Sequence, residues 1–330
     1  MKDASLPIKK ATHSMTSSHL NWFNNALKLR GSVIPAVLPR TLLCGGLGLL
    51  VSILYSQNIP VSFPIKSLIP DLVLGLLLVF RTNTAYARFW EGRQLWGTLV
   101  NTVRNLARHI WIIVEEKDPR DRQQKLKAIR LLVAFAVTVK LHLRQHPMHS
   151  DRNTPTDLKT LMSEDQYKTL HKMNNPPLEV AFWIGDYLQE QYHRERLNLY
   201  QLTAMQELLN TMVDVLGGCE RILKTPIPLA YAIHLKQLLL IYCCSLPFQM
   251  VQVAGWWTGP IIALIAFTLF GIEEIGIEIE DPFGCDPNDL PLNSICETML
   301  QNINDLTSLS PGGYASKTSI KTSLFNLKDE

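Results

Sequence analysis

The sequence has little charge for its length. Of its 330 residues, 18% are Asp, Glu, Lys or Arg, against about 25% in a typical soluble domain. The 32 basic and 29 acidic side chains leave a formal net charge of +3. This balance excludes a polyanion binder that works by bulk charge, and it excludes a highly charged disordered protein. Hydrophobic residues make up 47% of the chain, so we expect part of it to lie in a medium other than water.

Motifs that carry catalysis or metal binding are also missing. The six cysteines include no CxxC pair, so neither a disulfide framework nor a zinc site is indicated. There is no GxSxG, GxxxxGK[ST], GxGxxG or HExxH motif, and the nine histidines are scattered. Basic residues in 81–130 alternate with acids at helical spacing, which is typical of solvated helix faces. We therefore expect no enzyme, no nucleic-acid partner and no required cofactor.

Long uncharged runs are concentrated in three places. Thr41 to Ile59 has 19 residues without a charge, close to the about 20 that a membrane-spanning helix needs. Ser67 to Phe80 carries only Asp71 and passes directly into a polar and aromatic segment. Gln237 to Ile272 has 36 residues without a charge or a histidine, about 54 Å as one helix and too long for a bilayer. Gly255 to Pro260 interrupts this run with Gly, Pro and two Trp, so we expect two spans joined by a hairpin.

These runs predict an all-α integral membrane protein with four spans, at about 38–59, 67–90, 231–255 and 259–280. Core helices of a soluble protein are the alternative, but cores seldom supply 36 uncharged residues in succession. Lys and Arg are frequent in 1–40 and 81–130, and they are rare in the two links on the other side. The positive-inside rule therefore places both termini and the middle region in the cytoplasm.

The region between the second and third spans is polar and periodic. Apolar side chains recur at three- and four-residue spacing in 84–116, 121–146 and 177–216, which predicts amphipathic helices. We expect loops in 148–175, and we expect Gly217-Gly218 to end the last long helix.

Three apolar residues of the second span lie on one helix face. Leu72, Leu76 and Phe80 follow each other at four-residue spacing, which keeps them on this face over about 12 Å. Arg81 follows directly, and the helix turns polar there. Lipid or a neighbouring helix is the commonest partner of such a face, but an apolar collar that opens into a polar helix is also typical of a pore constriction.

Carboxylates follow the fourth span. In the loop from Asp281 to Pro291, the side chains of Asp281, Asp286 and Asp289 offer oxygen ligands for a cation such as calcium. The loop lacks the EF-hand register, so a capped turn is the other interpretation.

Several stretches together resemble the bestrophin family of channels, in particular its bacterial branch. They are GLLLVFRTNTAYARFWEGRQLWG, CERILKTPIP and EDPFGCDPNDLPL, which begin at Gly75, Cys219 and Glu280, with LKLRGSVIPAVLPR before the first span. The resemblance divides the chain into an N-terminal segment (1–26), a channel domain (27–305) and a tail (306–330).

The resemblance implies a homopentamer around one central pore, with Leu72, Leu76 and Phe80 forming its neck. It also implies a second, cytoplasmic aperture at Thr203, whose hydroxyl would make it wetter than an apolar side chain would. Asp286 and Asp289 match acidic positions of the family's calcium clasp. Cys285, Pro287 and Asn288 depart from the clasp, which puts calcium gating in doubt.

The predicted function is passive conduction of chloride and similar small anions. Arg81 and Arg88 would draw anions into the cytoplasmic vestibule, unless acids such as Glu91 neutralise them. A monovalent-cation channel of the same fold, favoured by Asp71 near the outer mouth, stays open, as does a non-conducting membrane scaffold. The expected partners are further copies of the chain, membrane lipid and small ions. A bacterial inner membrane or a photosynthetic internal membrane is the expected location.

Overall fold

The computed structural model describes residues 28–29, 31–61, 68–151 and 154–309, and all regular structure within them is helical. The predicted segment 1–26 and the tail from residue 310 onward lie outside the described residues. The chain divides into two compact units. The first combines the residues up to Leu74 with Gln237–Ile275, and the second combines Gly75–Lys236 with the residues from Gly276 onward.

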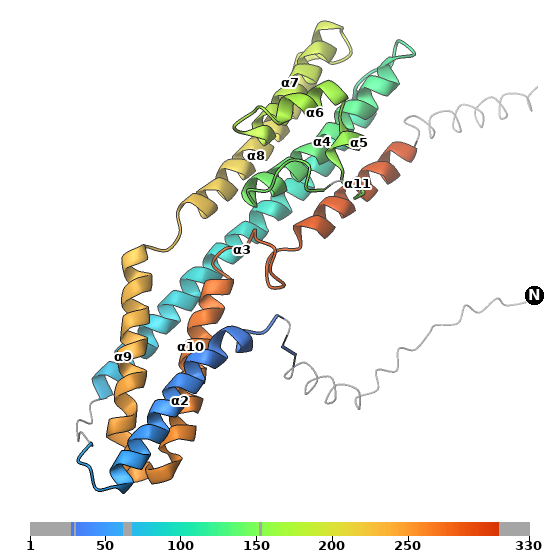
Figure 1. Cartoon of the computed structure of the whole chain (residues 1–330). Helices are drawn as coiled ribbons and strands as arrows, with labels where there is room; N and C mark the ends of the chain where they lie inside the picture. Colours follow the sequence, from blue (N-terminus) through green and yellow to red (C-terminus); the bar gives the residue numbers. More distant parts are fainter. Residues whose placement is uncertain (1–27, 30, 62–67, 152–153, 310–330) are drawn as a thin grey trace, which may run out of the picture. The chain divides into compact units, whose positions relative to one another are not determined.

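The first unit contains the apolar helices (Figure 1). They are α2 (Ile34–Ser56), the first turns of α3 (Leu68–Ile113), most of α9 (Leu229–Ala254), the short 3-10 helix η1 (Gly255–Trp257) and most of α10 (Thr258–Glu278). The boundary between the units falls inside α3, α9 and α10, so each of these helices contributes residues to both units.

Two stretches of the described residues are long and apolar enough to cross a membrane, Ile34–Ser56 and Leu229–Glu278. The second has 50 residues, about 75 Å as a single helix and far more than a bilayer about 30 Å thick requires. Helix η1 divides it, and Gly255 has a φ of 54°, a value that glycine adopts without strain. The predicted break at Gly255 is therefore confirmed, whereas the count of four spans stays a prediction.

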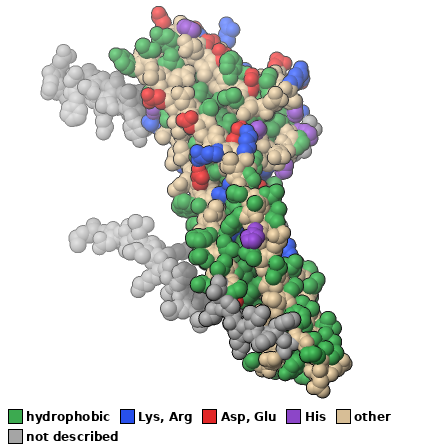
Figure 2. Space-filling model, turned by 90° about the vertical axis from the view of Figure 1, so that its left-hand side faces the viewer, with side chains coloured by type: hydrophobic (Ala, Val, Ile, Leu, Met, Phe, Trp, Pro, Cys, Tyr) green, Lys and Arg blue, Asp and Glu red, His purple; other side chains and the backbone are tan. Residues whose placement is uncertain are grey.

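The surface of the first unit is unusually apolar. Large aliphatic side chains are exposed on three of its helices, among them Leu43 on α2, Ile241 on α9 and Leu264 on α10. In Figure 2, hydrophobic side chains dominate the surface of this unit, whereas charged side chains gather on the second unit. Apolar exposure on several helices at once is expected of a protein whose surface meets lipid.

Helices α2 and α10 approach each other through glycines. A Cβ added to Gly48 would lie 2.9 Å from the Cα of Gly259, and one added to Gly259 would lie 2.5 Å from the side chain of Leu49. The hydroxyl of Ser52 donates to the Gly255 carbonyl at 2.9 Å and fixes the end of this contact. Small residues at a helix crossing allow close backbone packing in a membrane, where there is no hydrophobic drive to bring helices together.

The second unit is a helical layer built around α4 (Asp121–Leu143). Every residue from Leu131 to Leu141 is buried, which requires other helices on all sides. Those that pack on α4 include α7 (Pro176–His193), α8 (Leu199–Lys224) and α11 (Leu292–Ser308). Two short helices, α5 (Leu158–Leu161) and α6 (Glu164–Leu170), lie where only loops are predicted.

Two predictions about the helices between the second and third predicted spans are wrong. The segment 177–216 is not one helix, because Asn198 begins a new one with a capping box in which Gln201 takes part. The new helix, α8, does not end at Gly217-Gly218 but continues to Lys224. Gly218 is needed for close packing instead, since a Cβ there would lie 3.0 Å from the Leu95 side chain. Helix α11 also runs past residue 305, the predicted end of the domain.

The glycine contact yields a matched pair of substitutions. Gly48→Ala places a methyl group against the Gly259 backbone, which cannot move aside cheaply, and we expect it to destabilise the fold by about 1–3 kcal/mol. Gly46→Ala on the same helix meets nothing within 4 Å and should be neutral or stabilising by up to about 1 kcal/mol. Thermal unfolding of the two variants in detergent measures the difference. Equal melting temperatures would contradict the close contact.

Candidate functional site

Helix α3 has 46 residues and carries one continuous exposed line of side chains. Successive residues of a helix are rotated by 100°, so a subset of the α3 positions lies within about 40° of one line that runs along the helix. All of them are exposed: Leu72, Leu76, Phe80, Asn83, Ala87, Trp90, Gln94, Thr98, Asn101, Asn105, Arg108 and Ile112. We call this set the α3 stripe. It extends over about 60 Å at 1.5 Å per residue.

The chemistry of the α3 stripe changes along its length. Leu72, Leu76 and Phe80 are apolar, and their exposed fractions of 75%, 52% and 54% are high for such side chains. From Asn83 to Asn105 the stripe contains no acidic or basic residue. Arg108 is its only charged member. An apolar collar followed by an uncharged polar wall is the arrangement that the hydrophobic constriction of a channel requires.

The unbroken helix that carries the stripe is held by the loop after α10. A Cβ on Gly92 would lie 3.0 Å from Pro282 and 3.2 Å from the Phe283 ring, so this loop packs directly on the α3 backbone. The ring of Phe283 is itself buried. Glycine at position 92 is therefore explained by packing and not by a turn.

Arg81 and Arg88 do not act as free vestibule charges, which corrects the prediction made for them. Arg81 is 4% exposed, and its guanidinium is 2.6 Å from the Glu280 carboxylate. Arg88 donates to the backbone carbonyls of Glu280, at 3.1 Å, and of Ile222, at 2.6 Å. Glu91, the expected neutralising acid, pairs instead with Arg221. Both arginines are structural because each follows the apolar collar closely and must find partners inside the protein.

Glu280 is the residue that sequence reasoning missed here. One carboxylate oxygen accepts from Arg81, and the other accepts the backbone N–H of Ile227 at 2.9 Å. Its side chain therefore joins α3 to the corner between α8 and α9. Only the sequence position of Glu280, directly after an apolar helix and before a Pro-rich loop, could have hinted at such a role.

Thr203 lies in the first turns of α8, and its side chain is exposed, as a pore-lining position requires. Its hydroxyl donates to the Leu199 carbonyl at 2.9 Å. The helix itself thus uses the hydroxyl proton, which leaves only the oxygen lone pairs for other contacts.

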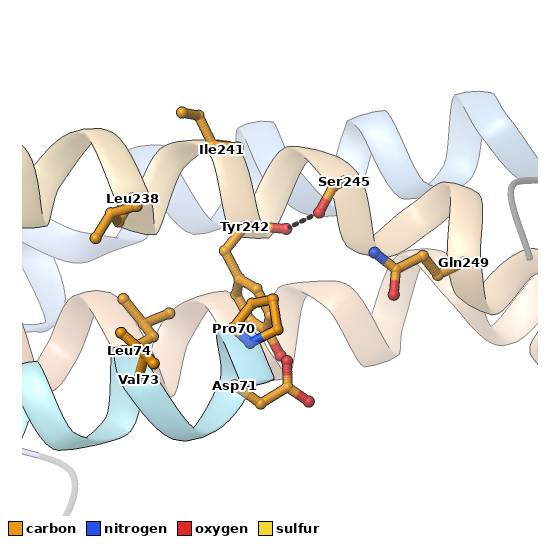
Figure 3. Close-up of a pocket in the computed structure, with 9 residues that line it drawn as sticks. All are labelled: Pro70, Asp71, Val73, Leu74, Leu238, Ile241, Tyr242, Ser245 and Gln249. Atoms are coloured by element: carbon orange, nitrogen blue, oxygen red, sulfur yellow. Dashed lines mark hydrogen bonds between the residues drawn. The ribbon is translucent and has the colours of Figure 1, made fainter. Parts of the chain in front are cut away.

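Asp71 lies beside a cavity of about 230 Å³ in the first unit (Figure 3). Val73, Leu74, Leu238 and Ile241 supply its apolar wall. The Tyr242 side chain hydrogen-bonds the carboxyl group of Asp71, and Ser245 donates to the Tyr242 carbonyl at 2.9 Å. The one acidic residue of the second apolar run therefore has a neutral hydrogen-bonding partner, Tyr242, which the sequence did not reveal.

Carboxylates of the loop from Asp281 to Pro291 accept hydrogen bonds from backbone N–H groups of the same loop. Asp281 accepts the N–H of Phe283 at 3.2 Å, and Asp289 accepts the N–H of Asp286 at 2.7 Å. Burial raises the pKa of Asp289, and the neighbouring carboxylates of Asp286 and Asp281 add to this increase. Among the described residues, no group of three or more His, Cys, Asp or Glu side chains is placed to hold a metal ion. The calcium site stays a prediction, and the capped-turn interpretation agrees with these hydrogen bonds.

Comparison with known proteins identifies the family. The profile described as "Bacterial/Fungal Bestrophin protein" matches residues 13–305. The chain belongs to this bestrophin family. A voltage-dependent anion channel-forming protein of Nostoc sp. is 62% identical over 298 residues, covering 90% of this chain and 95% of the relative. Another protein with that description, from Synechocystis sp., is 54% identical and covers 91% and 96% of the two chains.

Solved structures agree with this assignment. The crystal structure of a bacterial bestrophin homolog from Klebsiella pneumoniae, bearing one substitution, matches with a TM-score of 0.76 at 28% identity, over 84% of this chain and 99% of that one. Another neighbour is described as a membrane protein and matches with a TM-score of 0.72. Together with the two long apolar stretches, these similarities show that this bestrophin is an integral membrane protein.

The contacts of Glu280 predict a strong effect of one neutral substitution. Glu280→Gln leaves the buried Arg81 guanidinium without its counter-charge, so we expect a loss of about 3 kcal/mol. Glu91→Gln is the matched control, since the Glu91–Arg221 pair is exposed and should contribute only about 0–1 kcal/mol. Thermal unfolding in detergent compares the two variants. A smaller loss for Glu280→Gln than for Glu91→Gln would overturn the role assigned to Glu280.

Proposed function

We propose that this bestrophin is a passive anion channel in which five copies of α3 surround one central pore. The observation that carries the proposal is the α3 stripe, an exposed line that begins apolar and continues as uncharged, mostly polar side chains. Rotational symmetry multiplies each stripe residue into a ring. The stripe then becomes the wall of a pore, and the exposed leucines of the collar meet one another instead of water.

The apolar collar forms the neck. Three stacked rings of Leu72, Leu76 and Phe80 line a passage over about 12 Å along the axis. Water leaves an apolar constriction when it is narrow, and an ion then faces a dehydration barrier although nothing blocks its path sterically. The neck gates conduction by a small change in diameter, because widening readmits water.

The comparisons favour anions as the transported ions, and among these we propose chloride. The relatives from Nostoc sp. and Synechocystis sp. are both described as anion channel-forming proteins and match more than nine-tenths of their own length. A monovalent-cation channel of the same fold would rely on Asp71 at the outer end of the pore. Tyr242 donates a hydrogen bond to Asp71 but adds no positive charge, so the descriptions of the relatives, and not this contact, favour the anion channel.

We also propose on which side of the membrane each part lies and which membrane holds the protein. Both termini and the second unit lie on the cytoplasmic side, as the Lys and Arg distribution favours. The membrane is a bacterial inner membrane or a photosynthetic internal one. In this proposal conduction requires no metal or cofactor, and calcium binding by Asp281, Asp286 and Asp289 stays a separate prediction.

Assembly provides the first test. Multi-angle light scattering of the detergent-solubilised protein should give a protein mass about five times the 37.4 kDa of one chain. A monomer that persists at all concentrations would favour the alternative of a non-conducting membrane scaffold.

Truncation of the neck provides the functional test. We expect the combined variant Leu72→Ala, Leu76→Ala, Phe80→Ala to raise chloride efflux from liposomes by about tenfold or more, since each 1.4 kcal/mol removed from the barrier gives about tenfold. The rings of the variant are wider and hold water at all times.

The matched control truncates three exposed leucines of α2 in the same way, Leu42, Leu43 and Leu50, with exposed fractions of 62%, 65% and 52%. This control should leave efflux within about twofold of the wild type, because α2 does not line the pore. Unchanged efflux in the α3 variant, or an equal increase in the control, would remove the neck assignment.

A further inference from the structure

The inner end of the α3 stripe carries one charge. Arg108 is exposed, and within the described part of the chain its guanidinium has no hydrogen-bond or ion-pair partner. It also lowers the pKa of the neighbouring His109, an effect second to the burial of that ring. Arg108 therefore differs from Arg81 and Arg88, whose charges are satisfied inside the protein.

The other exposed arginines of α3 point elsewhere. Arg93 and Arg104 lie about 100° and 80° around the helix from the centre of the stripe. Both are exposed, and neither has an ion-pair partner among the described residues. Arg104 has the same charge as Arg108 on the same helix, one turn away, and is therefore a natural control for it.

Contacts between α3 and α8 fix the depth of Arg108. The two helices are antiparallel, since Leu95 touches Gly218, whereas the N–H of Glu115, further along the chain, donates to the carbonyl of Arg196 at 3.2 Å. Because the helices run in opposite directions, a residue a given number of positions after Leu95 lies beside the residue that many positions before Gly218, which places Arg108 beside Met205. The same count from the contact between Glu115 and Arg196 places Arg108 beside Thr203. Arg108 therefore lies at the depth of the predicted cytoplasmic aperture.

The same contacts fix the side on which these residues face. Glu91 lies about 60° from the centre of the α3 stripe, and it pairs with Arg221 of α8. Arg221 and Thr203 are 18 residues apart, which is about five full turns, so they share one face of α8. Thr203 therefore faces the side of α8 that adjoins the stripe, where Arg108 also lies.

We propose that Arg108 is the specificity-determining charge of the channel, a ring of guanidinium groups at the aperture that favours small monovalent anions. The proposal rests on the proposed function and adds to it the site of charge selection. Thr203 cannot supply the attraction, because its hydroxyl proton is donated within α8. The neck cannot supply it either, because apolar side chains raise the barrier for ions of both signs.

Acidic groups near the aperture oppose Arg108. Glu207, one turn after Thr203, and Asp214 are exposed on the same face of α8. Unit charges of opposite sign at such spacing partly cancel, so the wild-type anion preference is moderate. Removing the Glu207 charge with Glu207→Gln should increase this preference, and removing the Arg108 charge should reduce or reverse it.

The test is the reversal potential of purified protein in a planar bilayer under a potassium chloride gradient. Arg108→Gln should lower the anion-to-cation permeability ratio by at least about threefold, since local charge sets the local ion concentration. Arg108→Lys should retain most of the wild-type ratio, and Arg104→Gln should leave it unchanged. An unchanged ratio in Arg108→Gln, or an equal shift in Arg104→Gln, overturns the assignment.

A second measurement changes the charge at position 108 within one assembled channel and records the permeability ratio before and after. Arg108→Cys is recorded before and after a cationic thiosulfonate reagent, which should restore anion preference, and a separate recording uses an anionic reagent, which should lower it further. Arg104→Cys, recorded in the same way, should not respond, and it also accounts for reaction at the native cysteines.

Failure of this assignment and failure of the channel are distinguishable. A wild-type protein that carries no current overturns the proposed function and the assignment together. A conducting wild type with anion preference that survives every change at Arg108 overturns the assignment alone.

Discussion

Neutralisation of one arginine underlies the architecture of the second unit. Arg81 follows directly on the apolar collar of α3, where an uncompensated guanidinium would cost several kcal/mol. Glu280 provides the counter-charge and at the same time accepts the backbone N–H of Ile227. The point where α3 turns polar is therefore tied to the corner before α9 and to the segment that follows α10. Arg81 itself lies about 140° around the helix from the centre of the stripe, so its charge is held on the packed side of α3.

Much of the fold could be predicted from the pattern of apolar residues. The break at Gly255 and the passage of the second apolar run into one long helix follow from run length and from Gly and Pro placement. The same cues failed at Gly217-Gly218, where they indicate a helix end but the helix continues and Gly218 allows the Leu95 side chain to pack closely. A contact between residues distant in sequence has no local signature, so composition alone could not distinguish the two roles of glycine.

Part of the candidate site could also be predicted from the spacing of apolar residues. Helical spacing places Leu72, Leu76 and Phe80 on one face, and their exposure in the structure agrees with that arrangement. Helical spacing separates the arginines by direction, since Arg108 lies within about 40° of the centre of the stripe whereas Arg81 and Arg88 lie about 140° and 120° from it. Spacing could not identify their partners, which come from distant parts of the sequence: Arg81 pairs with Glu280, Arg88 donates to backbone carbonyls, and Arg108 has no such partner among the described residues.

The unbroken course of α3 has a consequence for how such a chain can change over evolution. One residue inserted between Phe80 and Arg108 would rotate every later side chain by about 100° relative to the collar. The side chains from Asn83 to Arg108 would then turn away from the face that carries the collar, whatever their identities. The length of this segment is therefore constrained more tightly than its composition: neutral polar residues can be exchanged along it, but insertions and deletions cannot be accommodated.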